Sequence, residues 1–88
     1  MEKLTMTIID QVGVHAKVAA SIVNIASQFE SDIYLIHNNE KANMKSILNI
    51  LALSINSQQE IQIEITGRDE IVAAQSIFNH LTNNNIAK

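Results

Sequence analysis

The chain has 88 residues, 47% of them hydrophobic, and a formal net charge of −3. This length suits one modest core, so we expect a single domain over residues 1–88. One tyrosine, two phenylalanines and the acidic balance offer no basic or stacking surface for nucleic acid. The chain has no cysteine for disulfides or thiolate metal sites, and its three histidines lack metal-ligand spacing, so we expect no metal and no cofactor. No apolar run has signal-peptide or membrane-spanning character, which predicts a cytoplasmic protein without membrane contact.

The first predicted element is a strand from Lys3 to Asp10. Leu4, Met6 and Ile8 recur at every second position, the period of a strand with one buried face. Residues 10–14 then form a turn.

A helix is predicted from Ala16 to Phe29, because its apolar residues recur at steps of three and four. The inward stripe consists of Ala19, Ile22, Val23, Ala26 and Phe29. The residues outside that stripe are small or polar: Ala20, Ser21, Asn24, Ser27 and Gln28. They form a surface without large side chains, which is consistent either with contact to a partner protein or with simple exposure to solvent.

Ser31 and Asp32 break the helix, and alternation over residues 33–36 predicts a second strand. Residues 37–40, which include His37, read as a turn because asparagine tolerates left-handed backbone conformations. A short returning strand over residues 41–43 completes a hairpin.

Ser46 has the hydroxyl preferred at a helix N-cap. The short helix that follows is unusually apolar from Ile47 to Ile55. Two interpretations remain open: the segment is buried throughout, or its excess apolar surface is exposed as an interaction site.

The clearest strand covers residues 61–66, where isoleucine alternates with polar side chains. Gly67 supplies a turn, and Asp69 is placed to cap the last helix. The inward stripe of that helix is predicted to be Ile71, Ala74, Ile77, Phe78 and Leu81. His80 lies near its end, which falls at the asparagines of residues 83–85.

The resulting order, βαββαβα, predicts an α+β fold: an open-faced β-sandwich with a four-stranded antiparallel sheet and three helices on one face.

His15 is the candidate reactive residue, because it lies between Gly13 and the start of the first helix. The first N–H groups of a helix lack intrahelical partners and carry partial positive charge, so they stabilise an anion. Here those donors are the amides of Ala16, Lys17 and Val18, and the Lys17 side chain adds a cation. The same positive end disfavours an imidazolium, which leaves a ring nitrogen free to attack phosphorus. On residue type alone, a solvated turn histidine is the more common situation.

Three motifs favour the interpretation that His15 is reactive: Val12-Gly13-Val14-His15-Ala16-Lys17, Asn43-Met44-Lys45-Ser46-Ile47 and Gly67-Arg68-Asp69-Glu70. Together they resemble HPr, the histidine-containing phosphocarrier family of the bacterial phosphoenolpyruvate:sugar phosphotransferase system, over essentially the whole chain. The resemblance implies a carrier, not an enzyme, that accepts a phosphoryl group on His15 from enzyme I and passes it to sugar-specific acceptor domains. It also implies the order of strands in the sheet.

The resemblance further implies that the second helix is part of the docking surface, through Ile47, Leu48 and Leu51. Ala20, Asn24 and Ser27 are the candidate contacts on the first helix. Ser46 matches the position that a kinase/phosphorylase modifies in many HPr proteins, where a phosphate next to the docking surface would weaken partner binding and engage a catabolite regulator. We expect the carrier itself to be a monomer.

The chain departs from the family directly after the histidine, because Lys17 and Val18 replace the usual Arg-Pro pair. Lysine is a flexible point charge, whereas arginine can hold two phosphate oxygens at once. This departure leaves an alternative, namely a regulatory binding module with weak or no phosphotransfer.

Overall fold

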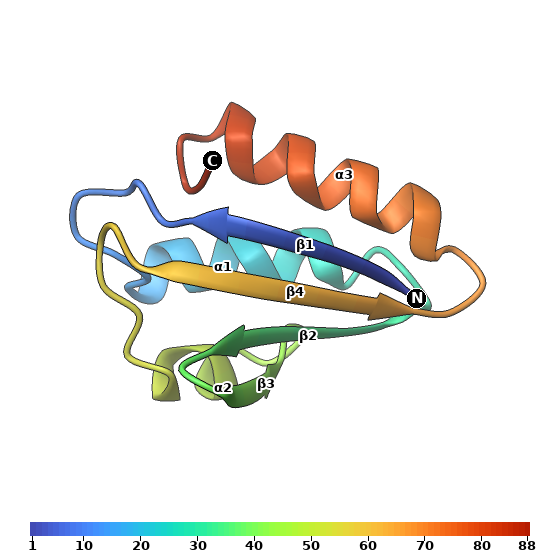
Figure 1. The fold of residues 1–88 in the computed structure, drawn as a ribbon, viewed down its shortest axis with the longest axis horizontal. Coiled ribbons are helices and arrows are strands. Elements are labelled where there is room, and N and C mark those ends of the chain that lie inside the picture. The colour runs from blue at the N-terminus through green and yellow to red at the C-terminus, as the bar shows by residue number, and fades with distance from the viewer.

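The structure, a computed structural model, describes residues 1–88 and confirms the predicted order of elements (Figure 1). Its strands and helices are β1 (Glu2–Thr7), α1 (Ala16–Ala26), β2 (Asp32–His37), β3 (Glu40–Asn43), α2 (Ile47–Ala52), β4 (Glu60–Thr66) and α3 (Glu70–Asn83).

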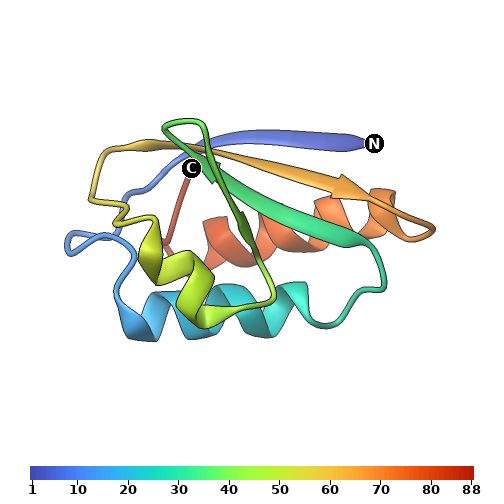
Figure 2. The same cartoon turned by 90° about the horizontal axis from the view of Figure 1, so that it is seen from below.

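The four strands form one antiparallel sheet in the order β1-β4-β2-β3. Strand β4 lies in the interior of the sheet, where Ile63 faces Leu4 of β1 on one side and Leu35 of β2 on the other. All three helices cover the same face of this sheet (Figure 2). The fold is therefore the open-faced α+β sandwich that the sequence predicts.

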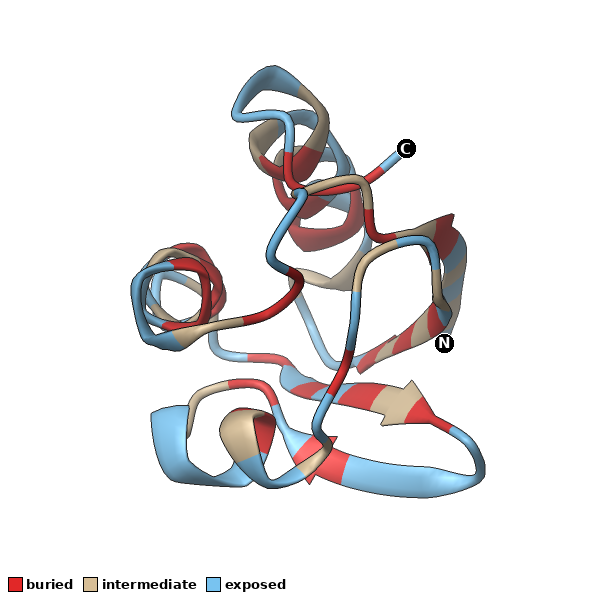
Figure 3. Cartoon of the chain, turned by 90° about the vertical axis from the view of Figure 1, so that its left-hand side faces the viewer, coloured by how far each residue is buried: buried red, intermediate tan, exposed pale blue.

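The hydrophobic core lies between the sheet and the helices, and both layers contribute buried residues to it (Figure 3). Ile61, Ile63 and Ile65 of β4 are at most 1% exposed, and the polar residues between them point to the open face. The same alternation buries Met6 and Ile8. Removing this apolar surface from water is the main favourable contribution to folding.

Most predicted strand ends agree with the structure to within one residue, but the ends of the first strand and of the first helix were wrong by three. Strand β1 ends at Thr7 rather than Asp10, because Ile8 bridges Ala87 and the amides of Ile9 and Asp10 donate to the Ile86 carbonyl instead of to a neighbouring strand. Helix α1 ends at Ala26 rather than Phe29, where short-range bonds such as Phe29 N–H to the Ala26 carbonyl (3.3 Å) replace the regular helical pattern.

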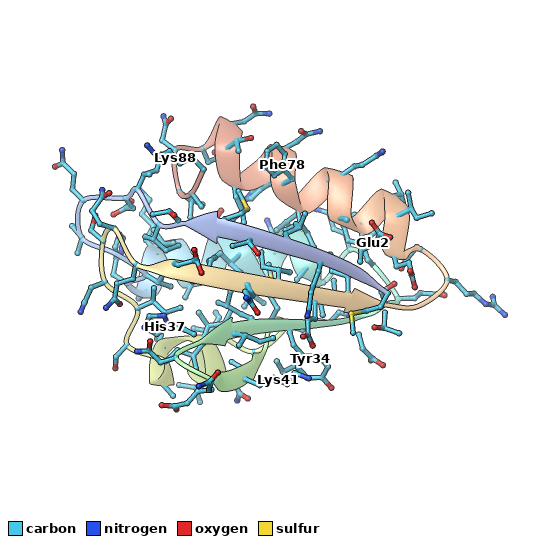
Figure 4. All side chains as sticks on the ribbon, in the orientation of Figure 1. Glu2, Tyr34, His37, Lys41, Phe78 and Lys88 are labelled. Atoms are coloured by element: carbon cyan, nitrogen blue, oxygen red, sulfur yellow. The ribbon has the colours of Figure 1, made fainter.

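The predicted inward stripe of α3 was partly wrong. Ala74, Ile77 and Leu81 are buried, but Ile71 is 65% exposed and Phe78 is 45% exposed. The buried face is instead completed by the small residue Ala73. The stripe is rotated relative to the prediction, and Phe78, labelled on α3 in Figure 4, instead lines a surface depression with Leu4 and Ile71.

Asp69 precedes α3 as predicted, but its carboxylate does not cap the helix. It accepts hydrogen bonds from the amides of Glu30 (2.8 Å) and Ser31 (3.0 Å) and from the Ser31 hydroxyl. The carboxylate thus connects the turn after α1 to the turn after β4.

His37 is the last residue of β2 and is buried, rather than lying in the predicted turn. Its Nδ1 is 3.2 Å from the Glu60 carbonyl oxygen, and its Nε2 is 3.3 Å from the Asn38 side-chain nitrogen.

The open face of the sheet is polar, and Lys41 lies over the Tyr34 ring at 4.8 Å (Figure 4). None of the three helices has the length and hydrophobicity needed to cross a bilayer.

Candidate functional site

The loop before α1 is held in one conformation by glycine. Gly13 has φ +90°, a conformation that favours glycine, and a Cβ atom there would lie 2.7 Å from the Ile55 carbonyl oxygen. The next residue, Val14, is buried and donates its N–H to the same oxygen at 2.9 Å. The loop therefore packs against the segment after α2, and the residue that follows Val14 lies at the surface.

That residue, His15, is the N-cap of α1, as predicted. Its backbone is extended, its side chain makes no capping hydrogen bond, and its carbonyl accepts the first helical bond from Ala19 at 2.8 Å. The amides of Ala16, Lys17 and Val18 donate to no acceptor in the protein. The imidazole and the three free donors thus belong to the same helix terminus, which is an arrangement suited to an anion.

The His15 side chain is 37% exposed, so a large partner can reach the ring. Its Nε2 lies 3.7 Å from Asp10 Oδ1, and the same carboxylate oxygen accepts the Val12 N–H at 3.0 Å. Nε2 is therefore the ring nitrogen that faces a carboxylate. Sequence reasoning missed Asp10, whose only local signal was an acidic residue at the start of the turn.

A cavity of about 380 Å³ opens beside the ring. It is lined by Asp10, His15, Lys17, Val18, Ser21, Asn84 and Ile86. Ser21 Oγ lies 2.8 Å from Nε2 of His80, a hydrogen bond that ties this wall of α1 to α3. Asn84 and Ile86 come from the C-terminal segment, so no pattern around His15 could have indicated them.

Lys17 is the cation of this site. It is exposed and lines the same cavity as the ring, whereas Val18 also lines the cavity but is only 6% exposed and belongs to the core. The residue types and their placement match the chemistry of an oxyanion held by backbone donors and one mobile positive charge.

Ser46 caps α2, as predicted. Its Oγ accepts the Asn49 N–H at 3.3 Å and the Asn49 side-chain amide at 3.1 Å. The preceding residue, Lys45, donates from Nζ to the Phe29 carbonyl at 2.7 Å, which fixes the start of α2 against the end of α1.

The candidate docking residues differ in exposure. Ile47 is 39% exposed and Leu48 is 79% exposed, which excludes the interpretation that this segment is buried throughout. Leu51 is half-buried and packs against the core. Helix α1 packs beside α2 (Figure 2). Its residues Ala20, Asn24 and Ser27 are all exposed. The structure therefore places the apolar residues of α2 on a helix next to the small exposed residues of α1.

A small open-faced sandwich with an exposed histidine at the N-terminus of its first helix defines the class of the protein, a histidine-bearing carrier domain. Residues 2–83 match the family described as "PTS HPr component phosphorylation site". The chain belongs to this HPr family of phosphocarriers.

Similar proteins match this chain over most of its length. The phosphocarrier protein HPr of Mycoplasma capricolum subsp. capricolum is 40% identical over 77 residues, which cover 88% of this chain and 86% of that protein. HPr of Treponema pallidum is 36% identical over 73 residues, or 83% of each chain. A solved mycoplasma histidine-containing phosphocarrier protein superposes with a TM-score of 0.94 at 34% identity, covering 99% of both chains. These comparisons do not favour the alternative of a binding module that lacks phosphotransfer.

Proposed function

We propose that His15 carries a phosphoryl group between phosphorylated enzyme I and sugar-specific acceptor domains, so that the protein acts as a cytoplasmic, single-domain carrier and not as a free-standing enzyme. The observation that supports this most is the juxtaposition of a 37% exposed imidazole with three amides that have no acceptor in the protein. A carrier requires access for two partners in turn, and an exposed ring at a helix terminus provides it.

The chemistry follows from this arrangement. Nδ1 of His15 attacks the phosphorus of the donor phosphohistidine; the donor N–P bond breaks, and its electron pair remains on the donor ring nitrogen. The phosphoryl oxygens then accept hydrogen bonds from the amides of Ala16, Lys17 and Val18, while the Lys17 side chain offsets their charge. Transfer to an acceptor histidine repeats the same step in reverse.

The partner surface we propose surrounds His15 on α1 and α2. Exposed Leu48 and Ile47 supply apolar contact area, and the small exposed side chains of α1 allow close approach. The full set is Ala20, Asn24, Ser27, Ile47, Leu48 and Leu51. Both enzyme I and the acceptor domains would use this surface, because both must reach the same ring.

Ser46 is the proposed regulatory residue. A phosphate on its hydroxyl would add about two negative charges at the N-terminus of α2, where the fold tolerates them, next to Ile47 and Leu48. Repulsion from an acidic partner would then weaken docking without unfolding the carrier. An HPr kinase/phosphorylase would make this change, and a catabolite regulator would recognise it.

The proposal is tested by incubation with phosphoenolpyruvate and enzyme I. We expect an acid-labile, base-stable phosphoprotein, and its loss in His15→Ala. His80→Gln is the matched control, because it removes a different histidine while leaving the labelled ring in place. Label retained in His15→Ala, or absent from the parent protein, would refute the assignment.

A further inference from the structure

Asp10 is the acidic residue that faces the ring, with Oδ1 3.7 Å from His15 Nε2. We propose that Asp10 is a positioning residue that keeps the proton on Nε2 and so directs phosphorylation to Nδ1. This inference rests on the proposed function, since it concerns the same ring, but it adds a residue that the helix terminus alone does not supply.

The carboxylate is held in place by its own loop. Oδ1 accepts the Val12 N–H at 3.0 Å, and the Asp10 carbonyl accepts the Gly13 N–H at 3.0 Å. The backbone just before it is fixed by a 2.9 Å hydrogen bond from Ile9 N–H to the Ile86 carbonyl. Side-chain oxygens that bond backbone two residues ahead stabilise such turns. Asp10 is therefore oriented before any phosphate arrives.

A carboxylate that faces Nε2 favours the tautomer with hydrogen on Nε2, which leaves the Nδ1 lone pair available. When Nδ1 attacks phosphorus and the donor N–P bond breaks, the proton stays on Nε2 and positive charge develops in the ring. Asp10 stabilises that charge. A separation of 3.7 Å exceeds hydrogen-bond length, so the interaction is mainly Coulombic.

The other groups around the cavity have different roles. Lys17 is the second charged side chain in its lining, and Ser21 and Asn84 are neutral. Asp10 and the phosphoryl group would both be negative, but the carboxylate faces Nε2 whereas the phosphoryl group would be bonded to Nδ1. The carboxylate therefore stabilises the protonated side of the ring, and the amides bind the phosphoryl oxygens.

The first test measures the tautomers of the unphosphorylated protein by ¹⁵N NMR of the His15 ring. Asp10→Asn removes the charge but retains an oxygen that can accept from Val12. We expect the ratio of Nε2–H to Nδ1–H forms to fall by about two- to fivefold, because the carboxylate no longer attracts the Nε2–H dipole; the magnitude is that of a weak electrostatic contact at a partly exposed site. Asp10→Ser, which can also support the turn, should behave alike, and Asp32→Asn at an exposed position of β2 should leave the ratio unchanged. An unaltered ratio in well-folded Asp10→Asn would overturn the proposal.

The second test uses phosphoramidate, which phosphorylates histidine without enzyme I. ³¹P NMR should show the label on Nδ1 in the parent and a larger Nε2 share in Asp10→Asn at equal extents of reaction. An identical distribution would count against Asp10. The two proposals fail separately: enzyme I labelling with unchanged tautomers removes only Asp10's role, whereas altered tautomers without enzyme I labelling remove only the carrier function.

Discussion

Asp69 and Ser31, which are far apart in the sequence, are joined by two hydrogen bonds from the Ser31 amide and hydroxyl to the Asp69 carboxylate. A third bond comes from the Glu30 amide at 2.8 Å. Donation from the Ser31 hydroxyl, and then from the Glu30 amide, holds the pKa of Asp69 below its ordinary value. The carboxylate thus links the end of α1 to the start of α3.

Because the pKa of Asp69 is lowered in the folded state, its contribution to stability is complete above the unfolded-state pKa of about 3.9 and is lost as pH falls through the lower folded value. We expect Asp69→Ala to lower the thermal unfolding midpoint at pH 7, and the difference from the parent to shrink on acidification below about pH 4. Thermal unfolding between pH 7 and pH 3 measures both. Asp32→Ala, at an exposed position, is the control; a pH-independent deficit in Asp69→Ala would contradict the linkage.

Gly13 should be intolerant of any side chain. Gly13→Ala combines a left-handed conformation with a Cβ atom 2.7 Å from the Ile55 carbonyl oxygen, so we expect a loss of about 1–3 kcal/mol in the free energy of unfolding. Urea denaturation measures it. Gly13→Asn separates the two causes, since asparagine tolerates positive φ but still carries a Cβ atom. Full stability in Gly13→Asn would show that the close contact is unimportant.

Leu48 and Ile50 of α2 form a matched pair, because one is 79% exposed and the other fully buried. Leu48→Ala should change stability by less than about 0.5 kcal/mol but weaken binding to enzyme I. Ile50→Ala should cost about 2–5 kcal/mol of stability. Denaturation and titration calorimetry with enzyme I provide the two measurements. Unchanged enzyme I affinity in Leu48→Ala would remove this residue from the docking surface.

Substitution of Ser46 should separate its capping role from its regulatory role. Ser46→Ala loses the oxygen that accepts from Asn49, at a cost of about 0.5–2 kcal/mol. Ser46→Asp retains a capping oxygen and adds charge, so we expect nearly normal stability with weaker enzyme I binding. Denaturation measures the stability of both variants, and titration calorimetry measures their affinity for enzyme I. Tight binding of enzyme I by Ser46→Asp would argue against electrostatic regulation at this position.

Lys17 provides a test of phosphate contact. Lys17→Arg should speed phosphoryl transfer from enzyme I, because a guanidinium can bond two oxygens at once. Lys17→Gln should slow transfer while leaving stability unchanged, since the side chain is exposed. Rapid-quench labelling measures the rates. Equal rates in all three proteins would show that this side chain does not contact the phosphoryl group.

The sequence by itself determined the order of the elements and the position of His15 at the N-terminus of α1. The alternation in β4, the helical repeat of α1 and the caps at His15 and Ser46 are local properties, because periodicity and capping depend on neighbours within a few residues. The family motifs around His15 are local in the same sense. This is why the order of elements, the free amides at the start of α1 and the exposure of Ala20, Asn24 and Ser27 were predicted correctly.

Only the tertiary structure decided which of two adjacent stripes on α3 is buried. Ala73 rather than Phe78 faces inward, because a small side chain allows the helix to pack closely on the sheet and on α1, and the repeat alone does not choose between neighbouring stripes. The cavity beside His15 is also tertiary, since Asn84 and Ile86 reach it from the other end of the chain. The direction of the Asp10 carboxylate depended on the turn and on the C-terminal segment that holds it. Contacts between distant segments follow from packing the whole chain at once, and no local pattern encodes them.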